Sequence, residues 1–133
     1  MSTAPAFERA VEARDLDSLV AALAPDIVFR SPVVYRPYEG REVVAKLLEA
    51  VMEVFDDFEY VQRFEADGAE ALIFRARVGD RTLDGLDLLR FDEDGLVSEL
   101  TVMVRPMSGT QALAAAMGQQ LERMGVPVPG GVS

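Results

Sequence analysis

The sequence contains no cysteine and no histidine. The lack of cysteine excludes disulfide bonds and thiol nucleophiles, and the two absences together exclude zinc sites built on either residue. A Ser-His-Asp triad is impossible for the same reason. Any acid–base chemistry must therefore be carried by Asp, Glu, Tyr, Lys or Arg.

Basic residues are also scarce. Lys and Arg number 13 against 23 Asp and Glu, which gives a formal net charge of −10. Nucleic-acid binding needs clustered basic side chains that neutralise phosphates, and an anionic membrane surface attracts the same side chains. We therefore expect neither nucleic acid nor a membrane as a partner.

Long apolar runs are missing as well. No stretch approaches the roughly 18 consecutive apolar residues of a membrane-spanning helix. The first residues, MSTAPAFERAVEARDLD, show no basic region followed by an apolar run, so they are not typical of a signal peptide. The acidic run Asp92–Gly95 lacks the spaced ligands of a calcium loop and is interpreted as a hairpin turn. These observations predict a cytoplasmic protein with no metal and no cofactor.

Hydrophobic periodicity predicts helices in the first half of the chain. Residues 5–14 carry apolar side chains at helical spacing, and Asp15 is expected to cap a second, short helix that ends at Ala24-Pro25. The clearest helix covers residues 41–55. Its apolar stripe consists of Val44, Leu47, Leu48, Val51 and Phe55.

The second half of the chain has the alternation of strands. A short strand is expected at residues 26–31, and from Asp57 to Pro106 apolar side chains recur at every second position. Turn signals divide this stretch into a four-stranded antiparallel meander, at Gly68, Gly79 and Gly95. A closing helix then stops at Gly125.

Helices that segregate from an antiparallel sheet indicate an α+β fold. With no internal repeat and no linker, we expect a single domain over residues 1–125. Residues 126–133, rich in proline and glycine, are expected to form a flexible tail.

One acidic residue, Asp87, shares the parity of the apolar sheet face. That face is expected to lie against the long helix and consists of Phe58, Tyr60, Phe64, Leu72, Phe74, Leu89, Phe91, Leu100 and Val102. In such surroundings desolvation raises the pKa of a carboxyl, which suits a general acid or base near neutrality. The alternative is that Asp87 is tied to a backbone amide or a tyrosine and only shapes a cavity.

Three segments of the sequence resemble those of SnoaL-like proteins in the nuclear transport factor 2-like superfamily. They are FxxAVEARDLDSLVAALAPDIVFRSP, YEGRE and RFDEDGLV. The resemblance implies a cone-shaped α+β barrel, in which a curved, mixed or antiparallel sheet wraps around the long helix. It also implies a ligand cavity between the two, and dimers that form through the outer sheet face.

The superfamily contains polyketide cyclases, epoxide hydrolases, ketosteroid isomerases, dehydratases and proteins with no known activity. The cyclases it resembles have an acid in the last strand where this chain has Val102. The histidine of the dehydratases is absent, and the two aspartates and arginine of the epoxide hydrolases are not matched.

We therefore expect a cavity that binds a small hydrophobic molecule, with Asp87 as the candidate catalytic residue for isomerase, cyclase or hydrolase chemistry. The alternative is a non-catalytic module that binds a ligand or a partner. The predicted ligand-binding residues are Phe29, Ser31, Tyr35, Tyr38, Phe55, Tyr60, Phe74, Leu89, Leu100 and Val102.

The opposite sheet face mixes arginine with large apolar side chains, a composition typical of protein interfaces. We expect it to form a homodimer, since the pattern is too diffuse to specify a phosphate. The predicted interface consists of Ile73, Arg75, Arg77, Leu86, Leu88, Arg90, Met103 and Arg105.

Overall fold

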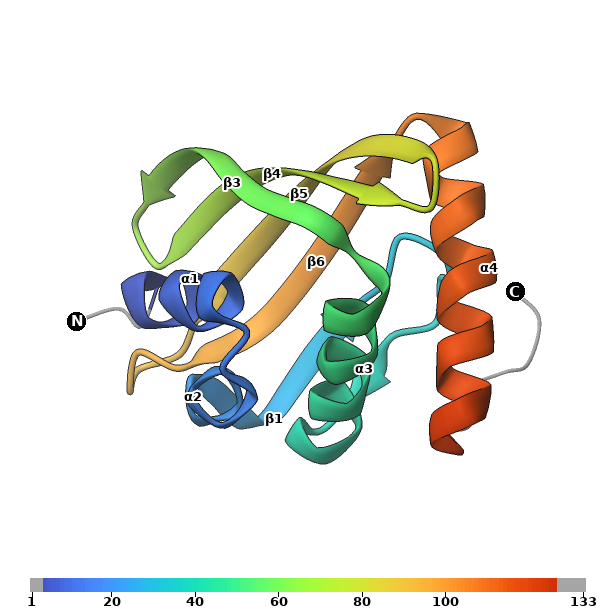
Figure 1. The fold of residues 1–133 in the computed structure, drawn as a ribbon. Helices are drawn as coiled ribbons and strands as arrows, with labels where there is room; N and C mark the ends of the chain where they lie inside the picture. Colours follow the sequence, from blue (N-terminus) through green and yellow to red (C-terminus); the bar gives the residue numbers. More distant parts are fainter. Residues whose placement is uncertain (1–3, 127–133) are drawn as a thin grey trace.

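The computed structural model describes residues 4–126, which form an α+β fold around a six-stranded sheet (Figure 1). In chain order the elements are α1 (Ala4–Ala13), α2 (Leu16–Ala21), β1 (Leu23–Arg30), β2 (Tyr38–Glu39), α3 (Arg41–Val54), β3 (Asp56–Ala66), β4 (Ala69–Val78), β5 (Arg81–Phe91), β6 (Val97–Arg105) and α4 (Met107–Met124). The strand order is β2-β1-β6-β5-β4-β3, and only β1 and β6 are parallel neighbours. The predicted α+β class with a curved mixed sheet is confirmed.

The first two helices follow the expected pattern until α2 ends. Asp15 caps α2, since its Oδ1 accepts a hydrogen bond from the Ser18 backbone N–H at 3.2 Å. The helix ends earlier than predicted because Leu23 already pairs with Val97 of β6. β1 therefore begins before the strand that the sequence predicts.

The long helix α3 provides the packing partner of the sheet. It starts after Gly40, whose φ of 99° falls in a region that favours glycine. Its buried side chains are those of the predicted stripe, Val44, Leu47 and Leu48, together with Ala50. The sheet curves around α1, α2 and α3, and α4 packs against α3 (Figure 1).

A β-bulge in β3 corrects the predicted inner face. Tyr60 pairs with Phe74, but Gln62 pairs with the next residue back, Ile73, so Val61 is an extra residue. Such an insertion reverses the alternation of all following side chains. Phe64, predicted to face the long helix, is therefore on the outer face and 54% exposed.

The last helix, α4, stops as predicted at Gly125, which adopts a left-handed φ of 72°. The helix begins after Pro106 with no side-chain cap. Of the predicted tail, residues 127–133 lie outside the described part. No helix within residues 4–126 is long and apolar enough to cross a membrane.

Candidate functional site

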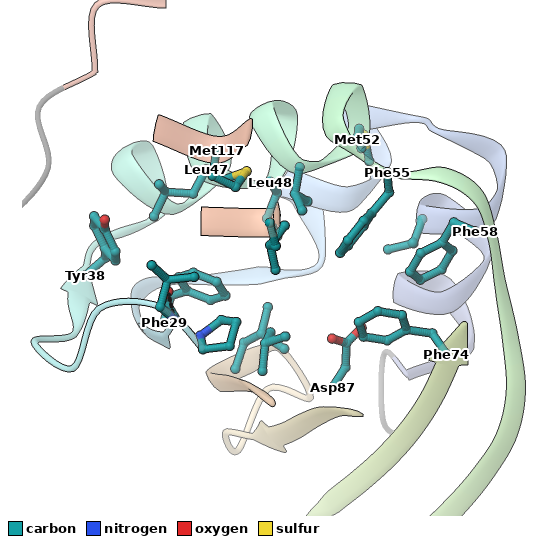
Figure 2. Close-up of a pocket in the computed structure, with 18 of the residues that line it drawn as sticks. Phe29, Tyr38, Leu47, Leu48, Met52, Phe55, Phe58, Phe74, Asp87 and Met117 are labelled. Carbon is teal, nitrogen blue, oxygen red and sulfur yellow. Dashed lines mark hydrogen bonds between the residues drawn. The ribbon is translucent and has the colours of Figure 1, made fainter. Parts of the chain in front are cut away.

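A pocket of about 350 Å³ lies between the inner sheet face, α3, α4 and the loop that follows β1 (Figure 2). This volume is at the lower end of the range typical of small-molecule sites. Most of the lining is apolar. The side chains with polar groups are Arg14, Ser31, Tyr38, Tyr60 and Asp87.

The structure brings most of the predicted site residues together around this pocket. Those that line it are Phe29, Ser31, Tyr38, Phe55, Tyr60, Phe74, Leu100, Val102 and the candidate catalytic residue Asp87. Strand alternation places the sheet residues on this face, and Phe55 lies at the C-terminal end of α3.

Two predicted binding residues lie elsewhere. The Tyr35 side chain is 95% exposed and outside the pocket, because its loop turns outward where Ser31 Oγ accepts hydrogen bonds from the Val33 and Val34 amides. Leu89 is fully buried in the core, but it does not line the pocket.

Asp87 is held in the pocket wall by β5, with Leu72 and Val102 opposite it on the two neighbouring strands. The residue is only 8% exposed. Its Oδ2 accepts a hydrogen bond from the Tyr60 hydroxyl at 2.9 Å. No donor within residues 4–126 bonds to the other oxygen, Oδ1, so that oxygen is available to a bound molecule.

Burial sets the protonation of this pair. It raises the pKa of Asp87 to about 7, and the hydrogen bond from Tyr60 opposes part of that rise. Burial, followed by the nearby charge of Asp87, raises the pKa of Tyr60 well above its ordinary value. Tyr60 therefore stays a hydrogen-bond donor, while Asp87 changes charge near neutral pH.

Aromatic rings form the wall beside Asp87 (Figure 2). The rings of Phe58 and Phe74 stack with centroids 4.9 Å apart, and Phe58 meets the Tyr60 ring edge-on at the same separation. Phe55 extends the group, 5.8 Å from Phe58. These contacts fix the position of the Tyr60 ring and place apolar side chains next to the Asp87–Tyr60 pair.

Gly85 allows this wall to form. It lies opposite Phe74 across the β4–β5 pairing, and a Cβ at this position would come within 2.0 Å of the Phe74 ring. The far end of the ring can therefore lie directly over Gly85, on the same face as Asp87 two residues along the strand.

Several pocket residues were not predicted from the sequence. Arg14 lines the pocket, has a positive φ of 56°, and donates a hydrogen bond from Nη2 to the Phe55 carbonyl at 2.8 Å. No sequence signal pointed to it. The lining also includes the α4 residues Leu113, Ala114, Met117, Gly118 and Leu121, whose helical spacing could have indicated a common face.

The outer sheet face carries ion pairs that strand alternation alone does not predict. Asp84 bonds to both Arg75 and Arg105, at 3.1 and 3.0 Å. Glu99 likewise lies 3.4 Å from Arg90 and 3.1 Å from Arg30. Arg77 pairs with Asp57 at 3.0 Å. The arginines of this face are thus paired with acids of the same chain, which leaves its role as an interface a prediction.

Within the described residues, no group of three or more acidic side chains is arranged to hold a metal ion.

Comparison with known proteins identifies relatives of the whole arrangement. A SnoaL-like domain family matches residues 5–100. The structure of a steroid delta-isomerase from Pseudomonas aeruginosa is 44% identical, with a TM-score of 0.88, and the match covers 92% of this chain and 90% of that one. No curated protein matches the sequence.

Two further structures share the fold. An uncharacterised protein with a cystatin-like fold from Silicibacter pomeroyi is 32% identical with a TM-score of 0.87, over 90% of this chain and 85% of the other. A SnoaL-like protein of unknown function from Burkholderia thailandensis has a TM-score of 0.66 at 17% identity, over 77% and 92%. The last similarity concerns the fold alone.

Proposed function

The chain belongs to the SnoaL-like domain family, and from this premise we propose that its pocket binds a small, largely apolar molecule on which Asp87 moves a proton. The reaction class we favour is the isomerisation of a double bond next to a carbonyl. The observation that carries the proposal is a buried carboxyl that accepts a hydrogen bond from Tyr60 in a largely apolar pocket, with its pKa raised to about 7.

The chemistry needs a single group that takes up a proton and gives it back. Ionised Asp87 removes a proton from the carbon next to the carbonyl, and the C–H electron pair shifts onto the carbonyl oxygen as an enolate. The double bond then re-forms at the new position as Asp87 returns the proton to a different carbon. A group that both accepts and donates works best when its pKa lies near the working pH.

Isomerisation fits better than hydrolysis or cyclisation for two reasons. Hydrolysis requires a water molecule to be activated while a leaving group is protonated, and Asp87 is the one carboxyl among the described lining residues. The acid of the related cyclases is replaced by Val102. The relative from P. aeruginosa, at 44% identity, carries the name of an isomerase.

Tyr60 acts here as a positioning residue. Its hydroxyl holds Oδ2 of Asp87, which leaves Oδ1 free to exchange the proton with the substrate. The hydrogen bond also keeps the pKa of Asp87 from rising further.

The test uses a steroid with a 3-keto group and a 5,6 double bond, whose isomerisation produces a conjugated enone that absorbs in the ultraviolet. We expect Asp87→Asn to lower kcat by at least about a hundredfold, the usual scale of general acid–base catalysis, while binding of the conjugated product persists. Glu70→Gln is the matched control, because Glu70 is also buried but lies outside the pocket lining. Equal turnover by the wild type and Asp87→Asn would remove Asp87 from the mechanism.

A second candidate function is ligand binding without turnover. It is favoured by the engagement of Tyr60 with Asp87, since this hydroxyl is then not free to stabilise an enolate oxygen. Tight binding of the conjugated product with no isomerisation by the wild type would support this function.

We also propose that the outer sheet face pairs with a second copy of the chain. Its centre is an apolar strip across β3 to β6, and the ion-paired arginines lie on either side. The strip contains Phe64, Ile73, Leu86, Leu88 and Met103, of which Phe64 and Met103 are more than half exposed.

A further inference from the structure

Arg14 lies in the turn between α1 and α2 and lines the pocket. Its φ of 56° falls in the left-handed region, which is uncommon for a residue with a side chain. The turn is held by backbone hydrogen bonds, from the Arg14 amide to the Val11 carbonyl at 3.1 Å and from the Asp15 amide to the Ala10 carbonyl at 2.9 Å. Glycine or asparagine is the usual residue at such a helix end, so the turn alone does not account for an arginine.

The guanidinium group of Arg14 is only partly used by the fold. Its Nη2 donates a hydrogen bond to the Phe55 carbonyl at 2.8 Å, at the C-terminal end of α3. Within residues 4–126 it has no acidic partner, although seven other arginines of this acidic chain form ion pairs. Nε and Nη1 of Arg14 are therefore available to a bound molecule.

Arg14 lies where the pocket meets solvent, since it is an exposed residue that also lines the pocket. Asp87, by contrast, is only 8% exposed. Aromatic rings connect the two positions. The Phe55 ring lies 5.8 Å from that of Phe58, and Phe58 in turn contacts Tyr60, which bonds to Asp87. A single apolar wall thus runs from the guanidinium at the opening to the carboxyl inside.

A negatively charged group on a ligand would be favoured at one place along this pocket. Beside Asp87 it would meet a second carboxyl in apolar surroundings, which is unfavourable. At the other end, marked by Tyr38 in Figure 2, the described lining has no charged side chain. Arg14 is the one cation among the described lining residues, and a group bound to it stays partly hydrated.

We propose that Arg14 binds a carboxylate of the ligand at the opening of the pocket, so that the pocket prefers amphipathic anions to neutral molecules of the same shape. The inference rests on the proposed function in taking this cavity as the ligand site, and it adds the charge of the ligand and its orientation. The apolar body lies along the aromatic wall. A carboxylate suits this position because its two oxygens match the planar N–H groups of a guanidinium.

The test compares two probes with the same two-ring body. 2-Naphthoate carries a carboxylate, and 2-naphthamide carries a neutral amide of nearly equal size in its place. We expect the wild type to bind 2-naphthoate about tenfold more tightly by calorimetry at pH 6, the scale of one hydrogen bond to a charged group. Arg14→Gln should abolish that preference and leave the affinity for 2-naphthamide unchanged.

Arg9→Gln is the matched control, since it removes the same charge from an exposed position of α1 that does not line the pocket. It should leave the preference unchanged. A second measurement needs no variant. In the wild type the preference for 2-naphthoate should weaken as sodium chloride is added, because salt screens a partly exposed ion pair.

Three results would overturn the inference: no preference for 2-naphthoate in the wild type, the same preference in Arg14→Gln, or an equal loss for both probes. The last result would mean that Arg14 only positions Phe55, and absence of binding by either probe counts as the first. A preference that depends on Arg14 in a protein without steroid turnover would contradict the proposed isomerisation but not this inference. Turnover that depends on Asp87 with no such preference would do the reverse.

Discussion

At Asp87, the burial that suits proton transfer also opposes folding. The folded-state pKa of about 7 lies above the ordinary value of 3.8. At a pH between these two pKa values, Asp87 is protonated in the folded protein and ionised in the unfolded chain. Stability from this residue therefore falls as the pH rises from about 4 to 7, because the carboxylate must then be buried with its charge.

We predict that Asp87→Asn is more stable than the wild type at pH 8 and that the difference shrinks at pH 5. The amide keeps an acceptor for Tyr60 but cannot ionise. The difference in the free energy of unfolding between the two proteins should narrow by about 3 kcal/mol from pH 8 to pH 5. Urea unfolding at both pH values measures it, and a gap that does not change with pH would show that Asp87 is not buried as a titrating group.

Single residues also mark where prediction from the sequence stopped. Asp87 and Tyr60 could be placed on one face because strand alternation holds along β5 and in β3 between its two register shifts. Tyr35 and Tyr38 are three positions apart in a loop with no such period. Nothing in the sequence separates the exposed ring from the buried one.

At the scale of the elements, β5 and α4 each contribute a glycine to the pocket region, and the two have opposite surroundings. A Cβ at Gly85 would enter the ring of Phe74, while a Cβ at Gly118 has no neighbouring atom within 4 Å. Gly118 lies in a helix interior, where glycine is less favourable than alanine.

We predict that Gly85→Ala destabilises the protein by about 1–3 kcal/mol, because Phe74 must leave its place against β5. Gly118→Ala should stabilise it by about 0.5–1 kcal/mol. Thermal or urea unfolding of the two variants gives both values. A neutral Gly85→Ala would mean that the aromatic wall moves without strain.

The elements themselves were largely predictable, and the exceptions have physical causes. Helices α1 and α3 and strands β3 to β6 follow from their hydrophobic periods. The bulge at Val61 could not be predicted in this way. One extra residue shifts the pairing of β3 with β4 without altering the apolar composition of the strand. The early start of β1 could not be foreseen because it depends on a pairing with β6, which is remote in the chain.

At the scale of the whole molecule, the outer sheet face is the proposed interface between two copies of the chain. We predict that Leu88→Glu combined with Met103→Glu produces a monomer, because two carboxylates would be buried without partners in the proposed interface. Light scattering measures the mass. Gln111→Glu with Gln119→Glu, at exposed positions of α4, adds the same charge and should leave the dimer intact.

A dimer that persists in the Leu88 and Met103 variant, or a wild type that is already monomeric, would contradict the proposed interface. The ion pairs of this face would then serve only to stabilise neighbouring strands. Exposed pairs of this kind contribute little each, so the face would also tolerate the loss of any one of them.

The parallel pairing of β1 with β6 has a consequence for the order in which the chain folds. Val28 meets Glu99, so the first long strand cannot complete its hydrogen bonds until nearly the last strand has been made. The hairpins of β3 to β6 pair strands that follow one another in the chain, so they can form without β1. Long loops close slowly. A growing chain would thus assemble the wall that holds Asp87 first, and join the Tyr38 end of the pocket to it last.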